Sequence, residues 1–171
     1  MNQMEANQWK QDLKQMIQDR DPKDIFNVNE TGSFYKCTPK NPFIQRSKMS
    51  RREVKQGKID IFAGSNMHGS EKLPLLMIGK FANPRCFKNV KSKPTEYVNS
   101  SNAWMTSDLF EKWVIKLDKK FIIEKLKVIV FMNNCTAHNT IPLMEYVKVV
   151  FFPANMTSVV QPMDQEIIKK L

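Results

Sequence analysis

The stretch Val128-Ile129-Val130-Phe131-Met132-Asn133-Asn134 places five apolar residues in a row and ends them at two asparagines. An apolar run without alternation is typical of a strand that is covered on both faces. In open α/β sheets, ligands bind beyond the carboxyl ends of such strands. We therefore expect residues 128–132 to form a central strand that carries Asn133 to the edge of a functional site.

The segments that flank this run alternate between helical and strand patterns. Thr106 and Ser107 are typical helix caps, and the residues after them form a broad apolar helix face. That face consists of Leu109, Phe110, Trp113, Val114, Leu117 and Phe121. Residues 147–152 indicate another apolar strand, and we expect a short helix near Pro142. Helical spacing returns at the end of the chain, with Ile167, Ile168 and Leu171.

Towards the N-terminus the sequence predicts one helix and three strands. The helix has an apolar face made by Trp9, Leu13, Met16 and Ile17, and Asp21-Pro22 ends it. Residues 25–29 indicate a short strand that ends at Asn29. Residues 58–67 and 72–79 are apolar runs that indicate a hairpin around a turn at residues 68–70.

The remaining segment between these elements lacks a regular pattern. Residues 81–102 contain two prolines, many lysines and no sustained period, which indicates an irregular insertion. We interpret Trp104 and Trp113, which follow it, as core residues. The order of elements predicts a mixed α/β sheet flanked by helices. Asn29 and Asn133 are each expected at the carboxyl end of a strand.

Length and composition indicate one folded unit. The chain has 171 residues, of which 42% are apolar, enough to bury a core. We divide it into an amphipathic helix and linker over residues 1–23 and a domain over residues 24–171. No apolar run reaches the roughly 18 to 20 residues of a membrane span, so no membrane partner is expected. Three well-separated cysteines, Cys37, Cys86 and Cys135, indicate reduced thiols and hence the cytosol or nucleus.

The charge balance favours a polyanionic partner. Lysine and arginine total 27 against 17 acidic residues, a net charge of +10, and the excess is gathered in two expected loops. The first contains Arg46, Lys48, Arg51, Arg52, Lys55 and Lys58, and the second contains Lys80, Arg85, Lys88, Lys91 and Lys93. Clustered cations bind phosphates with little sequence preference. We therefore predict weak, nonspecific DNA binding through the first group and Lys88; the alternative is a solvated basic face.

Four motifs give the chain a family resemblance. They are Asn27-Val28-Asn29-Glu30-Thr31-Gly32, Ala103-Trp104-Met105-Thr106, Asn133-Asn134-Cys135-Thr136-Ala137-His138, and Pro153-Ala154-Asn155-Met156-Thr157-Ser158 followed by Gln161-Pro162-Met163-Asp164-Gln165. From about Asp24 to the last residue, their order resembles the catalytic domain of pogo/Tigger-type transposases. That group belongs to the DDE superfamily and includes the Jerky-like proteins and centromere protein B.

The resemblance implies a ribonuclease-H-like fold with three acidic metal ligands. The family pattern is Asp-Glu-Thr-Gly in the first motif and Asp-Asn-Cys in the third, but here Asn29 and Asn133 replace the leading aspartates. Asp164 keeps the last position, 31 residues after Asn133. The resemblance thus makes Asn29, Asn133 and Asp164 the catalytic positions, with Asp164 as the remaining acidic metal ligand. It also implies a nuclear protein, and Mg²⁺ or Mn²⁺ for any remaining activity; homo- or hetero-association with related transposase-derived proteins stays open.

Electrostatics indicates that the two asparagines abolish cleavage. Two-metal phosphoryl transfer holds two dications about 3.5 to 4 Å apart, and their mutual repulsion is roughly 16 kcal/mol at an effective dielectric constant of 20. Three carboxylates would bring a charge of −3, whereas this set brings −1. Glu30 should point to the opposite strand face from Asn29, and Glu166 to another side of the expected final helix. Neither replaces an aspartate, so we expect no enzymatic activity and no cofactor.

Other interpretations stay open. A surviving nuclease would use Asp164 with asparagine oxygens, an interaction module would bind related proteins, and a relic would have no selected role. Cys135 and His138 have the spacing of metal ligands but no matching second pair, so we interpret them as a packed cysteine and a capping histidine. Recognition of transposon ends is not expected, because residues 1–23 are too short for a helix-turn-helix module. The family domain continues past Leu171, so we also expect a shortened final helix.

Overall fold

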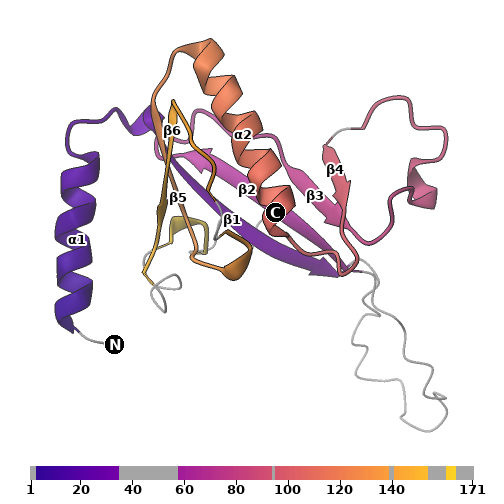
Figure 1. Ribbon diagram of the computed structural model, residues 1–171, viewed down its shortest axis with the longest axis horizontal. Helices are drawn as coiled ribbons and strands as arrows, with labels where there is room; N and C mark the ends of the chain where they lie inside the picture. The colour runs from indigo at the N-terminus through magenta and orange to yellow at the C-terminus, as the bar shows by residue number, and fades with distance from the viewer. Residues whose placement is uncertain (1–2, 35–57, 94, 139–140, 154–160, 165–171) are drawn as a thin grey trace, which may run out of the picture.

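The computed structural model describes residues 3–34, 58–93, 95–138, 141–153 and 161–164. Within these residues it contains one six-stranded sheet in the order β4-β3-β2-β1-β5-β6 (Figure 1). The strands are β1 (Ile25–Phe34), β2 (Lys58–Asn66), β3 (Leu76–Gly79), β4 (Glu96–Asn99), β5 (Val128–Met132) and β6 (Val147–Phe151). The helices are α1 (Gln3–Ile17) and α2 (Ser107–Glu124), and the 3-10 turns are η1 (Pro22–Asp24), η2 (Arg85–Phe87), η3 (Thr136–His138) and η4 (Pro162–Asp164).

The sheet mixes both kinds of strand pairing. β1 with β2 and β2 with β3 are antiparallel, whereas β3 with β4, β1 with β5 and β5 with β6 are parallel. Parallel neighbours need a crossover connection, and α2 lies in the connection that returns the chain from the edge strand β4 to β5, beside β1. The predicted mixed α/β sheet flanked by helices is confirmed. No helix in the described residues is long and apolar enough to cross a membrane.

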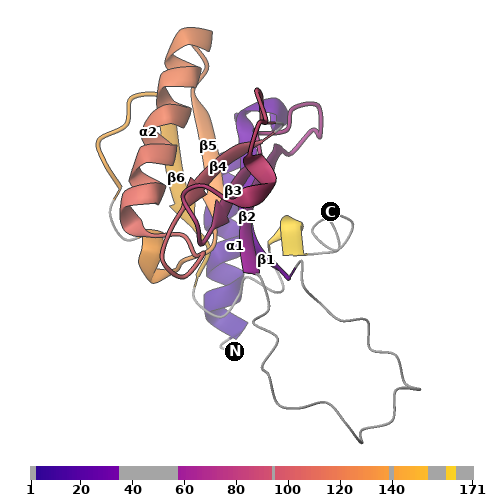
Figure 2. The same cartoon turned by 90° about the vertical axis from the view of Figure 1, so that its right-hand side faces the viewer.

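Helix α2 covers one face of the sheet (Figure 2). The Thr106 hydroxyl caps its start by accepting a hydrogen bond from the Leu109 N–H at 3.4 Å, and Lys125 ends it in the left-handed conformation, with φ 55°. The predicted apolar face is confirmed, and it packs on side chains of β1 and β5. Its fully buried apolar members are Phe110, Val114, Leu117 and Phe121. Burial of four such side chains stabilises the fold by roughly 1.5 to 3 kcal/mol each before entropy is counted.

One buried carboxylate attaches α2 to the start of β6. Asp118 accepts hydrogen bonds from the backbone N–H groups of Glu145, Tyr146 and Val147 at 3.2, 2.8 and 2.9 Å. These bonds hold the chain extended as it enters β6. The helix expected near Pro142 is therefore wrong: residues 141–146 are not helical, and the turn that follows β5 is η3 instead.

Helix α1 packs against the opposite face of the sheet. Its predicted apolar face contacts Ile25, Ile129 and Phe131, which alternate along β1 and β5 with the residues that face α2. The Trp9 ring meets the Phe152 ring edge-on, with ring centroids 6.2 Å apart. An apolar pocket of about 340 Å³ lies among α1, the sheet and η4, and Met163 forms part of its wall.

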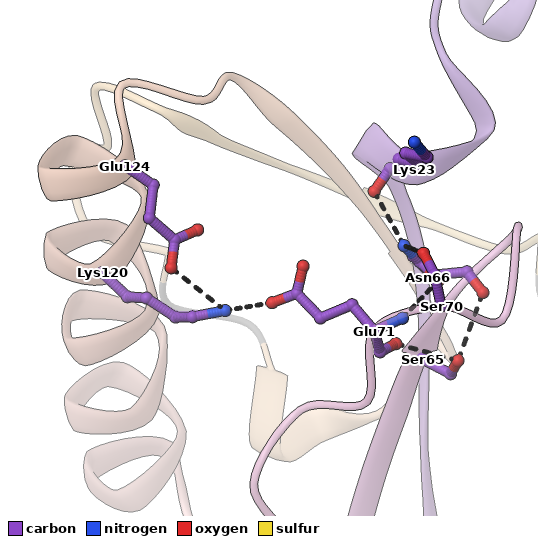
Figure 3. Close-up of polar contacts among 7 residues, drawn as sticks. All are labelled: Lys23, Ser65, Asn66, Ser70, Glu71, Lys120 and Glu124. Atoms are coloured by element: carbon purple, nitrogen blue, oxygen red, sulfur yellow. Dashed lines mark hydrogen bonds and ion pairs between the residues drawn. The ribbon is translucent and has the colours of Figure 1, made fainter.

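Polar side chains connect the turn after β2 to the rest of the domain (Figure 3). Asn66 donates to the Lys23 carbonyl at 3.2 Å and accepts from the Glu71 N–H at 3.1 Å. The Glu71 carboxylate in turn pairs with Lys120 on α2. The predicted hairpin is confirmed, but its second strand starts at Leu76 and not at residue 72, since Lys72 forms an isolated bridge with Ser65.

Three other expectations need correction. β1 runs on to Phe34 because β2 pairs with it over its whole second half. Part of the segment interpreted as irregular forms β4, a short edge strand in which only Tyr97 and Val98 favour strand structure. Trp104 is 55% exposed, because Ser100 bonds to both its N–H and its carbonyl and turns it outward. Trp113 packs on the core as predicted.

Candidate active site

The register of the central strands brings Asn29 and Asn133 together. β1 and β5 pair Ile25 with Ile129 and Asn27 with Phe131, so two further residues place Asn29 level with Asn133. Because side chains alternate along strands, both amides belong to the sheet face that Ile25 and Ile129 share with α1. Asn133 directly follows β5, as expected, but Asn29 lies in the middle of the longer β1. The edge of the site is thus set by the end of β5.

Turn η4, which ends at Asp164, docks on β1 beside Asn27 and Val28. Asn27 links three elements, since it donates to the Phe131 carbonyl at 3.0 Å and accepts from the Met163 N–H at 3.0 Å. Gln161 is fully buried and donates to the Val28 carbonyl at 3.2 Å. Asp164 is the last residue of η4; its side chain lies outside the described residues, as do Glu166 and the expected final helix. The strand register thus places Asn29 beside Asn133, and η4 ends at Asp164 after contacting β1 at Asn27.

The two amides have different surroundings. Asn29 is 4% exposed, and its Oδ1 atom accepts a hydrogen bond from the Glu30 N–H at 2.8 Å. Asn133 Oδ1 is buried and has no hydrogen-bond partner among the described residues. The Asn133 carbonyl, in contrast, lies 3.0 Å from Nδ1 of His138. The Asn29 amide oxygen therefore has a hydrogen-bond donor, whereas the Asn133 amide oxygen has none among the described residues.

The opposite face of β1 carries a polar cluster that the sequence analysis did not find. We call Glu30, Lys58, Asp60, Cys135 and His138 the Glu30 cluster. Glu30 points away from Asn29, as predicted, and its Oε1 atom lies 2.9 Å from Nε2 of the fully buried His138. The ligand atoms of Glu30, Cys135 and His138 all lie within 4.8 Å of one another. The sequence does contain a signal, namely the Cys135-x-x-His138 spacing together with Glu30. Only the register of the strands brings these residues together.

The charges of the Glu30 cluster influence one another strongly. Burial lowers the pKa of His138, but hydrogen bonds to Cys135, Glu30 and the Asn133 carbonyl outweigh it and raise the pKa to about 9. Burial, together with the nearby Glu30 carboxylate, raises the pKa of Asp60 to about 6. Asp60 shares its face of the sheet with Glu30, because Glu30 pairs with Phe62, two residues along β2. The cluster is thus a set of interacting acids and bases on one face of β1 and β2, two inner strands of the sheet.

Lys58 belongs to this cluster more than to an open basic surface. Its ammonium is buried against the Trp104 ring. Burial lowers the pKa of Lys58, an effect that Asp60 and Glu30 partly offset. Gly32 makes room for it, because a Cβ atom there would lie 3.1 Å from the Cε atom of Lys58. To contact DNA, the Lys58 ammonium would first have to move away from the Trp104 ring.

Of the other predicted DNA-binding residues, the structure describes Lys88. It is exposed and lies directly after η2. Arg46, Lys48, Arg51, Arg52 and Lys55 lie outside the described residues. The loop around Lys88 also presents other cations that are exposed and form no ion pair within the described part of the chain, namely Lys80, Arg85 and Lys91.

Comparison with known proteins places this arrangement in a family. The model of the DDE superfamily endonuclease family matches residues 56–171. Mouse Tigger transposable element-derived protein 4 is 41% identical over 165 residues, which cover 95% of this chain and 32% of that protein. CENP-B homolog protein 2 of Schizosaccharomyces pombe is 30% identical over 91% of this chain and 32% of its own length. The chain spans about a third of the length of these relatives.

A solved structure shows the fold. The Mos1 transposase paired-end complex with left transposon end matches 96% of this chain and 45% of its own, with a TM-score of 0.56 and 11% identity. The sheet and its flanking helices thus have a ribonuclease-H-like fold. The chain belongs to the DDE superfamily endonuclease family, within its pogo/Tigger-type branch of transposase-derived proteins. The resemblance inferred from the four motifs is confirmed.

Proposed function

We propose that this chain is a catalytically inactive, transposase-derived DDE domain that binds DNA weakly and without sequence preference in the nucleus. The observation that carries the proposal is the position of Asn29 and Asn133, level with each other on β1 and after β5, on the face where η4 ends at Asp164. A family member with aspartates at the first two positions would present a row of three carboxylates there. This chain presents two neutral amides and one carboxylate.

The donor set does not fit a pair of divalent cations. Mg²⁺ and Mn²⁺ bind through carboxylates and water, and Asn29 Oδ1 is already engaged by the Glu30 N–H. An amide also turns positive N–H hydrogens towards a cation if it rotates. The missing charge leaves most of the roughly 16 kcal/mol repulsion between two dications uncompensated. No catalytic step is therefore assigned to this set of residues.

DNA binding is supported by the exposed cations of the loop between β3 and β4. Lys80, Arg85, Lys88 and Lys91 can each approach a phosphate without breaking an ion pair of the described structure. Such contacts release counterions and carry little sequence information. Similarity to a transposase solved with a transposon end agrees with this class of partner. The nuclear location follows from the class of partner and from the family.

The decisive experiment is nicking of supercoiled DNA in Mn²⁺. Four purified proteins are compared: the unmodified chain, Asp164→Ala, Asn29→Asp with Asn133→Asp, and that double variant with Asp164→Ala added. We expect no nicking by the unmodified chain. If the double variant nicks DNA and this activity disappears when Asp164→Ala is added, the two asparagines alone account for the inactivity of the unmodified chain. Nicking by the unmodified chain that disappears in Asp164→Ala would overturn the proposal.

A second candidate function, residual metal-dependent endonuclease activity, is favoured by one feature. The buried Oδ1 atom of Asn133 lacks a hydrogen-bond partner in the described residues, and a carbonyl oxygen of this kind can coordinate a cation. Such a site would hold one ion between Asn133 and Asp164. Calorimetric titration with Mn²⁺ separates the candidates, because residual activity requires binding that Asp164→Ala abolishes.

A further inference from the structure

We propose that Glu30, Cys135 and His138 form a binding site for a single Zn²⁺ ion, on the opposite face of β1 from Asn29 and Asn133. The site does not rest on the proposed function, since none of its three ligands is a triad position. Its ligands come from two elements, the middle of β1 and the loop with η3 that follows β5. An ion there would fasten that loop to the central strand.

The geometry is close to that of a bound ion. Ligands of tetrahedral Zn²⁺ lie roughly 3.3 to 3.6 Å from one another, given bond lengths near 2.0 to 2.3 Å. Here the carboxylate oxygen, the thiol sulfur and the imidazole nitrogen all lie within 4.8 Å of one another. His138 Nε2 and Glu30 Oε1 are 2.9 Å apart, so an ion would enter by separating them slightly and replacing the proton between them.

The second nitrogen of His138 is arranged as in many metal sites. Nδ1 lies 3.0 Å from the Asn133 carbonyl, which accepts its hydrogen. A carbonyl in that position keeps a hydrogen on Nδ1, so Nε2, which faces Glu30, is the nitrogen that would bind an ion once its proton is lost. The ring is held between aromatic side chains, with its centroid 4.4 Å from that of Phe110 and 6.2 Å from that of Phe62. The nitrogen ligand is therefore oriented before an ion arrives.

The donor chemistry selects zinc over the hard cations of transposition. A thiolate and an imidazole favour Zn²⁺ and Co²⁺, whereas Mg²⁺ and Mn²⁺ favour carboxylates and water. One carboxylate and one thiolate would neutralise the ion. Glu30 and Cys135 are both partly exposed, so an ion can reach the site and a water molecule can supply the fourth ligand. Bound Zn²⁺ would displace the protons of the thiol and of Nε2 into solvent.

The test is titration of the metal-free full chain with Co²⁺, followed by displacement with Zn²⁺. A thiolate bound to Co²⁺ gives a charge-transfer band in the near ultraviolet, and tetrahedral coordination gives intense visible bands. We expect both for the unmodified chain, with one equivalent of Co²⁺. Cys135→Ser should abolish the charge-transfer band. His138→Asn and Glu30→Gln should weaken affinity by more than the roughly 10- to 100-fold lost with an outer-shell partner.

Matched variants keep the result specific. Cys37→Ser and Cys86→Ser remove the other two cysteines of the chain, and Asp164→Ala removes the carboxylate of the triad; each should leave both sets of bands intact. The fold of Cys135→Ser is checked by its circular dichroism and urea midpoint. A second measurement needs no variant: Zn²⁺ should protect Cys135 of the unmodified chain from alkylation. Absence of a thiolate band in the unmodified chain, or a band that survives Cys135→Ser, would overturn the proposal.

Discussion

The Nε2 atom of His138 lies 2.9 Å from Oε1 of Glu30, and this contact joins the loop after β5 to the middle of β1. Both partners also touch the triad positions through backbone groups. The Glu30 N–H donates to Asn29 Oδ1, and His138 Nδ1 lies beside the Asn133 carbonyl. The two adjacent residues Asn29 and Glu30 therefore serve opposite faces of one strand. The pairing of His138 with Glu30 thus lies one hydrogen bond away from each asparagine.

The raised pKa of His138 predicts that the metal-free protein loses stability in mild alkali. Protonated His138 stabilises the fold because its pKa rises from 6.5 to about 9 on folding. The full contribution, about 3 kcal/mol, is present below pH 6.5 and is lost as the pH rises through 9. Urea unfolding with a chelator present, from pH 6 to 10, measures it.

Two variants test that prediction. Glu30→Gln removes the charged partner, so the fall in unfolding free energy between pH 6.5 and 9 should shrink. His68→Asn changes the other histidine of the chain, which is exposed, and should leave the pH profile unaltered. If the unfolding free energy of Glu30→Gln falls with pH as steeply as that of the unmodified chain, a group other than the His138–Glu30 pair causes the fall. Asp60, whose pKa is raised to about 6, changes its protonation mainly below pH 6.5.

Removal of the Asp118 carboxylate should destabilise the domain strongly. Asp118→Ala leaves three backbone N–H groups without their acceptor at the start of β6. An unsatisfied buried donor costs about 1 to 3 kcal/mol, and Val147 is buried while Glu145 is exposed, so we expect a loss of roughly 2 to 4 kcal/mol in chemical denaturation. Asp118→Asn keeps one acceptor and should lose less.

The control for Asp118 lies on the same helix. Asp108 is exposed in the first turn of α2, where a carboxylate gains only about 0.3 to 1 kcal/mol from the helix dipole. Asp108→Asn should therefore lose less unfolding free energy than Asp118→Ala. Equal losses for the two substitutions would mean that the bonds from Asp118 to the start of β6 contribute little to stability.

Elements with a continuous apolar pattern could be predicted from the sequence. Residues 128–132 are all buried in β5, and the face of α2 follows the spacing of Leu109 to Phe121. In both cases local propensity and tertiary burial act in the same direction. The triad positions were found by family resemblance, and the β1–β5 register then explains why Asn29 and Asn133 lie side by side.

Features that depend on partners distant in sequence could not be predicted. β1 extends to Phe34 through pairing with a strand that begins at Lys58, and β4 is an edge strand defined by its neighbour β3. The Glu30 cluster needs residues from three separate segments, and single residues carry no signal of that meeting. Asp118 likewise carries no signal in the sequence that distinguishes it from other polar residues of α2, although its hydrogen bonds hold the start of β6.

Gly79 and Tyr97 should be energetically coupled. A Cβ atom on Gly79 would lie 2.2 Å from the Tyr97 hydroxyl oxygen and 2.8 Å from two ring carbons. Gly79→Ala therefore has to displace the ring, which holds the Phe81 carbonyl by a 2.6 Å hydrogen bond. We expect a loss of about 1 to 3 kcal/mol and faster hydrogen exchange in residues 80–93.

A double-mutant cycle with Tyr97→Ala tests this coupling. If the alanine clash is the cause, Gly79→Ala should cost little once the ring is absent, with a coupling energy of about 0.5 to 3 kcal/mol. Additive losses would show instead that Gly79 matters for its backbone alone. The result bears on DNA binding, because Tyr97 anchors one end of the loop that carries Lys88.

Neutralising the loop between β3 and β4 should reduce the salt dependence of DNA binding. The loop variant changes Lys80, Arg85, Lys88 and Lys91 to alanine. Each phosphate contact contributes about 0.9 to the slope of log affinity against log salt concentration on duplex DNA, so loss of all four should reduce the slope by up to about 3 to 4. Fluorescence anisotropy of a labelled duplex over a range of NaCl concentrations measures the slope.

The matched control removes the same number of charges elsewhere. It changes exposed lysines of α1 and α2, namely Lys10, Lys14, Lys112 and Lys119. A third variant changes Arg51, Arg52 and Lys55, the predicted contacts outside the described residues, and should also weaken binding. If the loop variant and the control weaken binding equally, net charge alone governs affinity and the loop is not the contact surface. A reduced slope in the loop variant with a nearly unchanged slope in the control assigns the phosphate contacts to the segment between β3 and β4.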